Sequence, residues 1–106
     1  MRDRMLQLLS LSRRAGKLLR GFDQVKDGIA QQQVCAVLLA QDLSPKTEKE
    51  LRYVCRDATV PFVCVPATMK ELEKYVGKKV GVLALTEKGF ADKVQALAQE
   101  SPQMKP

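Results

Sequence analysis

The sequence predicts an α/β fold in which helices cover both faces of one sheet. Apolar runs at 34–40, 61–65 and 80–85 are too short for independent helices and too apolar for strands that face water. Segments with a helical spacing of apolar residues lie between these runs. Strands that alternate with helices form a sheet between two helical layers, so we expect a three-layer α-β-α sandwich.

The N-terminal third is expected to contain two helices and one extended segment. Apolar residues at helical spacing predict a first helix over 3–15, and Gly16 supplies its C-terminal stop. A short extended piece is predicted at 17–20. After Gly21, apolar residues at i, i+3 and i+7 predict a second helix over 22–32.

The rest of the chain carries explicit helix-start signals. Ser44 is expected to cap a helix that has Pro45 at its first position. Thr68 and Glu71 have the spacing of a capping box, which predicts a further helix that ends at Gly77. Apolar residues at helical spacing from residue 86 onward predict a last helix that ends before residue 101.

Length and composition favour one small domain. The 106 residues, 45% of them apolar, are enough to bury a core without a metal or disulfides, so we expect a single domain over 1–100 and a flexible tail over 101–106. No apolar run approaches the length of a membrane span, and Arg13 and Arg14 interrupt the N-terminal apolar segment, so we expect a cytoplasmic protein.

Each cysteine lies inside an apolar run, and we expect buried, reduced thiols at Cys35, Cys55 and Cys64.

The basic residues are concentrated near the N-terminus. The formal net charge is +6. Residues 1–26 hold seven bases and two acids, whereas residues 27–106 hold eleven bases and ten acids. The excess therefore belongs to the first quarter of the chain, an asymmetry that is typical of a surface that binds a polyanion.

The sequence contains no residue pattern that is typical of a catalytic or cofactor-binding site. Histidine is absent, which excludes Ser/His/Asp triads and histidine metal sites. The six glycines do not have the spacing of a dinucleotide-binding or phosphate-binding loop. Asp42 ends an apolar run, where catalytic acids often lie, but the following Ser44 and Pro45 explain it as a turn residue. We expect a protein without catalytic residues, metal or cofactor.

A short basic segment between Gly16 and Gly21 is the strongest candidate for a binding site. It opens onto the predicted helix at 22–32, whose first N–H groups and positive dipole end favour a phosphate. Polar Asp23 and Gln24 in the first turn are suited to contacts with the edges of RNA bases. The alternative, that these charges only solvate the surface, stays open at this point.

Five segments occur in the order and spacing of a known family. They read Leu-Ser-Leu-Ser-Arg-Arg-Ala-Gly-Lys at 9–17, Arg-Gly at 20–21, Val-Leu-Leu-Ala-Gln-Asp at 37–42, Val-Pro at 60–61 and Ala-Leu-Thr-Glu-Lys-Gly-Phe-Ala at 84–91. Through them nearly the whole domain resembles the kink-turn RNA-binding ribosomal protein family, and most closely its small bacterial YlxQ-type members.

This resemblance implies a mixed, roughly four-stranded sheet and a non-catalytic function. It implies binding of structured RNA, either a sharply bent kink-turn or ribosomal RNA, with the ribosome as a candidate partner. The contacts would come from the loop into the second helix and from the loop before the last strand. The matching residues are Lys17, Arg20, Gly21, Phe22, Asp23, Gln24, Lys26, Gly77, Lys78 and Lys79.

The motif at the second helix differs from the family pattern, which runs basic-Gly-x-Asn-Glu-x-x-Lys from Arg20. Asp23 occupies the asparagine position and Gln24 the glutamate position. Asp27 occupies the lysine position, and Lys26 lies one residue before it. Beside RNA binding, Asp23 and Asp27 suggest an alternative function, a protein-interaction domain on the same fold that has lost tight RNA binding. For either function we expect a monomer that makes no contact with membranes.

Overall fold

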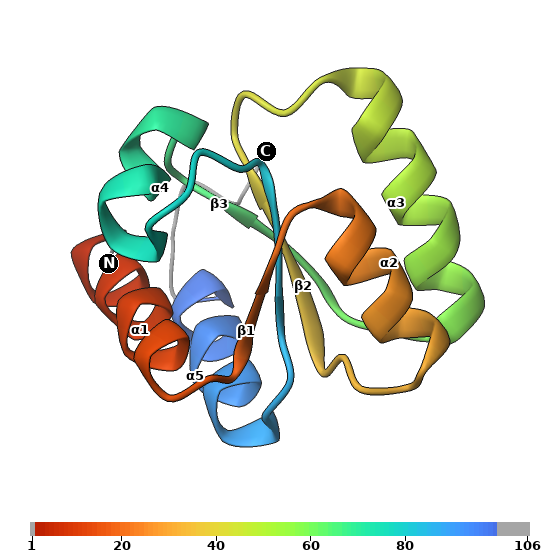
Figure 1. The fold of residues 1–106 in the computed structure, drawn as a ribbon, viewed down its shortest axis with the longest axis horizontal. Helices are drawn as coiled ribbons and strands as arrows, with labels where there is room; N and C mark the ends of the chain where they lie inside the picture. Colours follow the sequence, from red (N-terminus) through yellow and green to blue (C-terminus); the bar gives the residue numbers. More distant parts are fainter. Residues whose placement is uncertain (1, 100–106) are drawn as a thin grey trace.

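The computed structural model describes residues 2–99 and contains a single four-stranded sheet within them (Figure 1). The prediction of a flexible tail at 101–106 lies outside the described residues. In chain order the elements are α1 (Arg2–Arg14), β1 (Leu18–Arg20), α2 (Phe22–Ala30), β2 (Ala36–Ala40), α3 (Pro45–Ala58), β3 (Phe62–Val65), α4 (Met69–Val76), β4 (Val82–Leu85) and α5 (Lys88–Gln99).

The sheet is mixed, as expected. Its strand order is β1-β4-β2-β3, and only the pair β2 and β3 is parallel; β4 runs antiparallel to both β1 and β2. Helices α1, α4 and α5 lie on one side of the sheet, and α2 and α3 lie on the other (Figure 1). The predicted three-layer α-β-α sandwich is therefore confirmed.

Both faces of the two central strands are buried, which explains their continuous apolar sequences. Successive side chains of a strand point to opposite faces. Leu38 and Leu83 accordingly pack in the core under α1, α4 and α5, whereas Val37 and Val82 pack in the core under α2 and α3. Neither strand has a face that meets water, so neither shows the polar alternation of an exposed strand.

The predicted helix boundaries are confirmed where a side chain or a glycine defines them. Ser44 Oγ accepts a hydrogen bond from Thr47 N at 3.2 Å, and Thr68 and Glu71 form the reciprocal bonds of a capping box. Gly16 and Gly77 both adopt the left-handed conformation that ends a helix, with φ of 73° and 76°.

Other boundaries differ from the expectation by one to two residues. Helix α2 ends at Ala30 instead of residue 32, because Gln32 has a φ of 60° and the N–H of Gln33 bonds back to the carbonyl of Gly28. The helix thus ends next to a left-handed residue that is not glycine, and the sequence carries no strong signal for an end at this position. The three long strands also begin one or two residues later than predicted, at Ala36, Phe62 and Val82.

Thr59 ends α3 in the left-handed conformation, with a φ of 59°. This conformation crowds the β-carbon of an L-residue, and Thr59 is β-branched and exposed. Thr59→Gly is expected to raise the free energy of unfolding by about 1 kcal/mol, as measured by urea denaturation. Ala30→Gly, at an exposed position with helical geometry, is the control and is expected to lower it. A loss of stability in Thr59→Gly would contradict the strain.

The prediction of three buried cysteines is correct only in part. Cys55 is buried, and burial raises the pKa of its thiol while the nearby Arg52 opposes the shift. Cys35 is half-buried, and Cys64 is exposed. The exposure of Cys64 follows from its place in β3, an edge strand in which Val63 and Val65 point into the core under α1, α4 and α5 while Cys64 points to the opposite face.

Candidate nucleic-acid interface

The two loops that the sequence singled out lie next to each other at one end of the sheet (Figure 1). The loop into α2 contributes Gly21, whose N–H donates to the carbonyl of Val82 at the start of β4 at 2.9 Å. The loop before β4 contributes Lys78, whose Nζ would lie 3.9 Å from a β-carbon at position 21. Segments almost 60 residues apart in the chain thus form one continuous surface.

Arg20 joins these two loops. Its Nη1 donates a 2.7 Å hydrogen bond to the carbonyl of Val76, the last residue of α4. The C-terminal end of a helix carries partial negative charge, so a guanidinium there is favourable. Arg20 is half-buried. Its side chain therefore holds the two loops together in addition to contributing positive charge.

The entrance to α2 depends on Gly21 and Gln24. Gly21 has φ 105° and ψ 153°, a conformation that is open to glycine and strained for other residues. Gln24 Oε1 accepts a 3.1 Å hydrogen bond from the N–H of Arg20, which ties the first turn of α2 back to β1. The side-chain oxygen of Gln24 thus stabilises the conformation of this loop.

The first turn of α2 is suited to an anion. Gly21, the N-cap residue, has no side chain that accepts hydrogen bonds from the N–H groups of the first turn. These N–H groups and the helix dipole favour a phosphate oxygen. Phe22 anchors this turn in the core under α2 and α3, and Lys26 Nζ lies 5.6 Å from the centroid of its ring. Asp23, exposed in the same turn, adds a negative charge to this surface.

Arg13 also lies at this surface, although the sequence pattern did not predict its position there. A β-carbon at Gly77 would lie 2.7 Å from Cζ of Arg13, so the guanidinium at the end of α1 covers this glycine. Packing of α1 against α4 thus brings Arg13 to Gly77, the residue that precedes the exposed Lys78 and Lys79. The two arginines at 13–14 are evident in the sequence as basic residues, but no spacing pattern indicates that Arg13 lies against Gly77 in the fold.

Lys17 is the one predicted site residue that the fold separates from the others. It precedes β1, and its carbonyl accepts a 3.0 Å hydrogen bond from the N–H of Thr86, at the opposite end of the sheet from Gly21. Three strand residues separate Lys17 from Gly21, a distance of roughly 10 Å or more along an extended chain. Arg20 is the last residue of β1, and the remaining predicted site residues lie on α2 or on the two adjoining loops.

Within residues 2–99, the described side chains form no metal site, and no helix is suited to span a membrane. Among the side chains that the structure describes, no three of His, Cys, Asp or Glu are grouped closely enough to hold a metal ion. No helix in this range is both long and apolar enough to cross a membrane. Asp42, at the end of β2, accepts a 2.9 Å hydrogen bond from the N–H of Met69, so its carboxylate stabilises the start of α4.

Comparison with known proteins identifies relatives along nearly the whole chain. The RNA-binding protein YlxQ of Bacillus subtilis is 35% identical over 91 residues, which cover 85% of this chain and 90% of that protein. The RNA-binding protein YlxQ of Enterococcus faecium is 28% identical over 99 residues, covering 92% and 94%.

Solved structures share the same fold. A protein of unknown function from Bacillus halodurans superposes with a TM-score of 0.84 and 32% identity, covering 90% of this chain and 96% of that one. The 15.5kD RNA binding protein of Giardia lamblia superposes with a TM-score of 0.74 and 17% identity, covering 90% and 82%. The sequence pattern of one family matches residues 3–96. The chain belongs to the ribosomal protein L7Ae/L30e/S12e/Gadd45 family.

Proposed function

We propose that this protein binds structured RNA without catalysing a reaction, and that its ligand is a kink-turn or a similarly bent ribosomal RNA element. The observation that carries the proposal is the junction of the two predicted loops, where Gly21 and Lys78 lie side by side. The names of the curated relatives describe RNA binding, and the family name describes ribosomal proteins. We further propose that one monomer binds one RNA in the cytoplasm.

The contacts would be divided between phosphate and base recognition. Arg13, Lys78 and Lys79 would meet phosphates, together with the free N–H groups at the start of α2. Asp23 and Gln24 in the first turn would face base edges. Arg20, Gly21 and Gly77 would mainly shape the surface, since they set the backbone of the two loops and link them. Lys17 lies outside this surface, and the site as proposed does not require it.

A direct comparison of two RNAs tests this function. The purified protein would be titrated onto a labelled kink-turn RNA and onto a straight duplex of equal length, at low and at physiological salt. A preference for the kinked RNA that persists at physiological salt is the expected result. Equal and weak binding to both RNAs would mean that the surface attracts RNA only through its positive charge. That result would favour a protein as the partner.

The acidic residues in α2 lead to a prediction about RNA preference. Asp23→Asn combined with Asp27→Lys reverses two of the three departures from the family pattern, adds an amide donor, removes two negative charges and adds one positive charge. We expect the ratio of kink-turn to duplex affinity to rise about tenfold, since a base-reading polar contact contributes roughly 1–3 kcal/mol. The ratio separates base reading from a general gain in charge, which strengthens both complexes. An unchanged ratio would mean that these positions do not read the RNA.

A further inference from the structure

The outward face of α3 carries a second basic surface that the proposed function does not use. One side of this helix carries four residues at the spacing i, i+3, i+7 and i+10, namely Lys46, Lys49, Tyr53 and Arg56. All four are exposed. Tyr53 is 67% exposed, which is unusual for a large aromatic side chain on a small protein.

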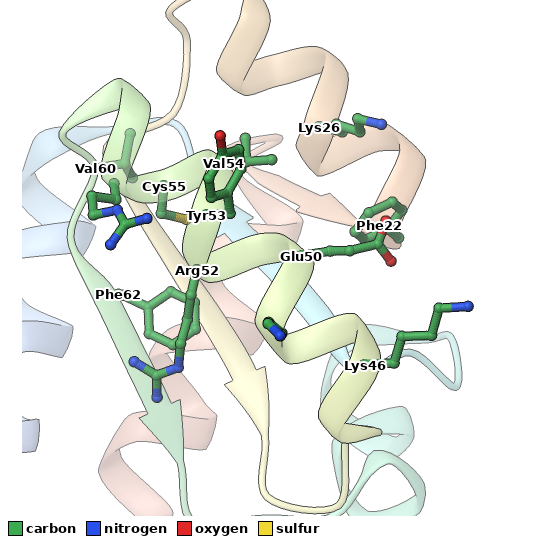
Figure 2. A pocket seen from close by; sticks show the side chains of 12 residues that line it. Phe22, Lys26, Lys46, Glu50, Arg52, Tyr53, Val54, Cys55, Val60 and Phe62 are labelled. Carbon is green, nitrogen blue, oxygen red and sulfur yellow. The ribbon is translucent and has the colours of Figure 1, made fainter.

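Cations lie against aromatic rings along this face. Arg56 Cζ lies 5.6 Å from the centroid of the Tyr53 ring, and Arg52 Cζ lies 4.3 Å from that of Phe62. Figure 2 shows Arg52 extending from α3 across the Phe62 ring of β3. Glu48 fixes Arg52 in place, because Nη2 of Arg52 lies 2.9 Å from the Glu48 carboxylate. The flat guanidinium and the phenol ring therefore form platforms on which a planar group can stack.

These platforms border a shallow cleft of about 800 Å³ around α3, and its lining carries five basic side chains and one acid, Glu50. The cleft reaches α2, where Phe22 and Lys26 also line it (Figure 2). Phe22 and Lys26 belong to the first turns of α2, beside the proposed RNA site. The face of α3 and the proposed site are therefore continuous.

We propose that this face, hereafter the α3 face, binds a single-stranded segment that flanks the structured RNA. A positively charged track with exposed aromatic rings is the arrangement that binds single strands, because the backbone is anionic and every base has a face that stacks. A duplex keeps its bases stacked on one another and has no free base for Tyr53. This inference rests on the proposed function, since the structured RNA would deliver the flanking strand through the continuous cleft.

The test compares one RNA with and without a single-stranded extension. The probes would be the kink-turn RNA and the same RNA carrying six unpaired pyrimidines at its 5′ or 3′ end. For the natural sequence, one of the two extensions is expected to tighten binding about tenfold, the contribution of one well-stacked base. Tyr53→Ala is expected to abolish this gain and to leave affinity for the RNA without an extension unchanged. Tyr53→Phe, which keeps the ring, is the matched control and is expected to retain it.

The outcomes separate this inference from the proposed function. Failure to bind the kink-turn RNA without an extension would contradict the proposed function. Normal binding of that RNA with no gain from either extension would contradict only the role of the α3 face, and so would a gain that persists in Tyr53→Ala. An acidic peptide of glutamates tests the other class of ligand. Peptide binding that requires Tyr53, with no gain from either RNA extension, would reassign the face to a protein partner.

Discussion

Leu83→Ala is expected to lower the free energy of unfolding by roughly 2–5 kcal/mol, the range for removing a buried leucine from a packed core. Leu83 lies in β4, is 0% exposed and pairs with Leu38 of β2 on one side and Arg20 of β1 on the other. The substitution leaves a cavity between the sheet and the helices α1, α4 and α5. A small domain has a total stability of only about 5–15 kcal/mol, so the loss is a large fraction of it.

Urea denaturation at fixed temperature measures this effect, and Leu11→Ala is its control. Leu11 is the same residue type at 48% exposure, and its truncation is expected to change stability by less than about 0.5 kcal/mol. Equal losses in the two variants would contradict the burial of Leu83. Because β4 pairs with the strand that carries Arg20, partial unfolding of Leu83→Ala is also expected to weaken RNA binding at raised temperature.

Replacing Lys78 and Lys79 together by alanine is expected to weaken binding to all RNAs and to flatten its salt dependence. Each phosphate contact contributes close to one unit to the slope of log affinity against log salt. Both lysines are exposed on the loop before β4, where Lys78 lies close to Gly21 and Arg13 lies against the preceding Gly77. Loss of two contacts should therefore reduce the slope by up to about two units. Titrations at several salt concentrations, on kinked and straight RNA alike, measure it.

The matched control removes two lysines from α5. Lys88→Ala with Lys93→Ala changes the net charge by the same amount, and α5 begins at the end of the sheet opposite the proposed site (Figure 1). This variant is expected to keep the slope of the natural sequence. If both double variants flatten the slope equally, binding depends on the overall charge of the protein, and the loop before β4 has no special role.

Local signals in the sequence predicted the elements well. Capping residues and glycines set helix ends through hydrogen bonds between residues that are close in the chain, so Ser44, Thr68, Gly16 and Gly77 were recognisable from spacing alone. The stop at Gln32 was missed, because glutamine has no intrinsic preference for the left-handed conformation. The exposure of Cys64 was missed as well, since an apolar run does not reveal whether its strand lies at the edge of the sheet.

The candidate site was predictable as two separate loops but not as a surface. The loops were found from their basic residues and from resemblance to a family. Their adjacency depends on β4, which pairs with β1 and so places Val82 opposite Gly21. The same packing brings Arg13 to Gly77 and moves Lys17 to the far end of β1. Contacts over such sequence separations leave no local pattern.

The sequence by itself determined the α/β class, the order of elements and the basic character of the protein. These depend on hydrophobic periodicity, on local caps and on charge, which act over a few residues or on the chain as a whole. Only the tertiary structure decided which basic residues share a surface, that Arg20 bonds to the carbonyl of Val76, and that Tyr53 stands exposed among cations on α3. The physical reason is that strand pairing and helix packing join residues far apart in the chain, and their geometry is set by the whole core.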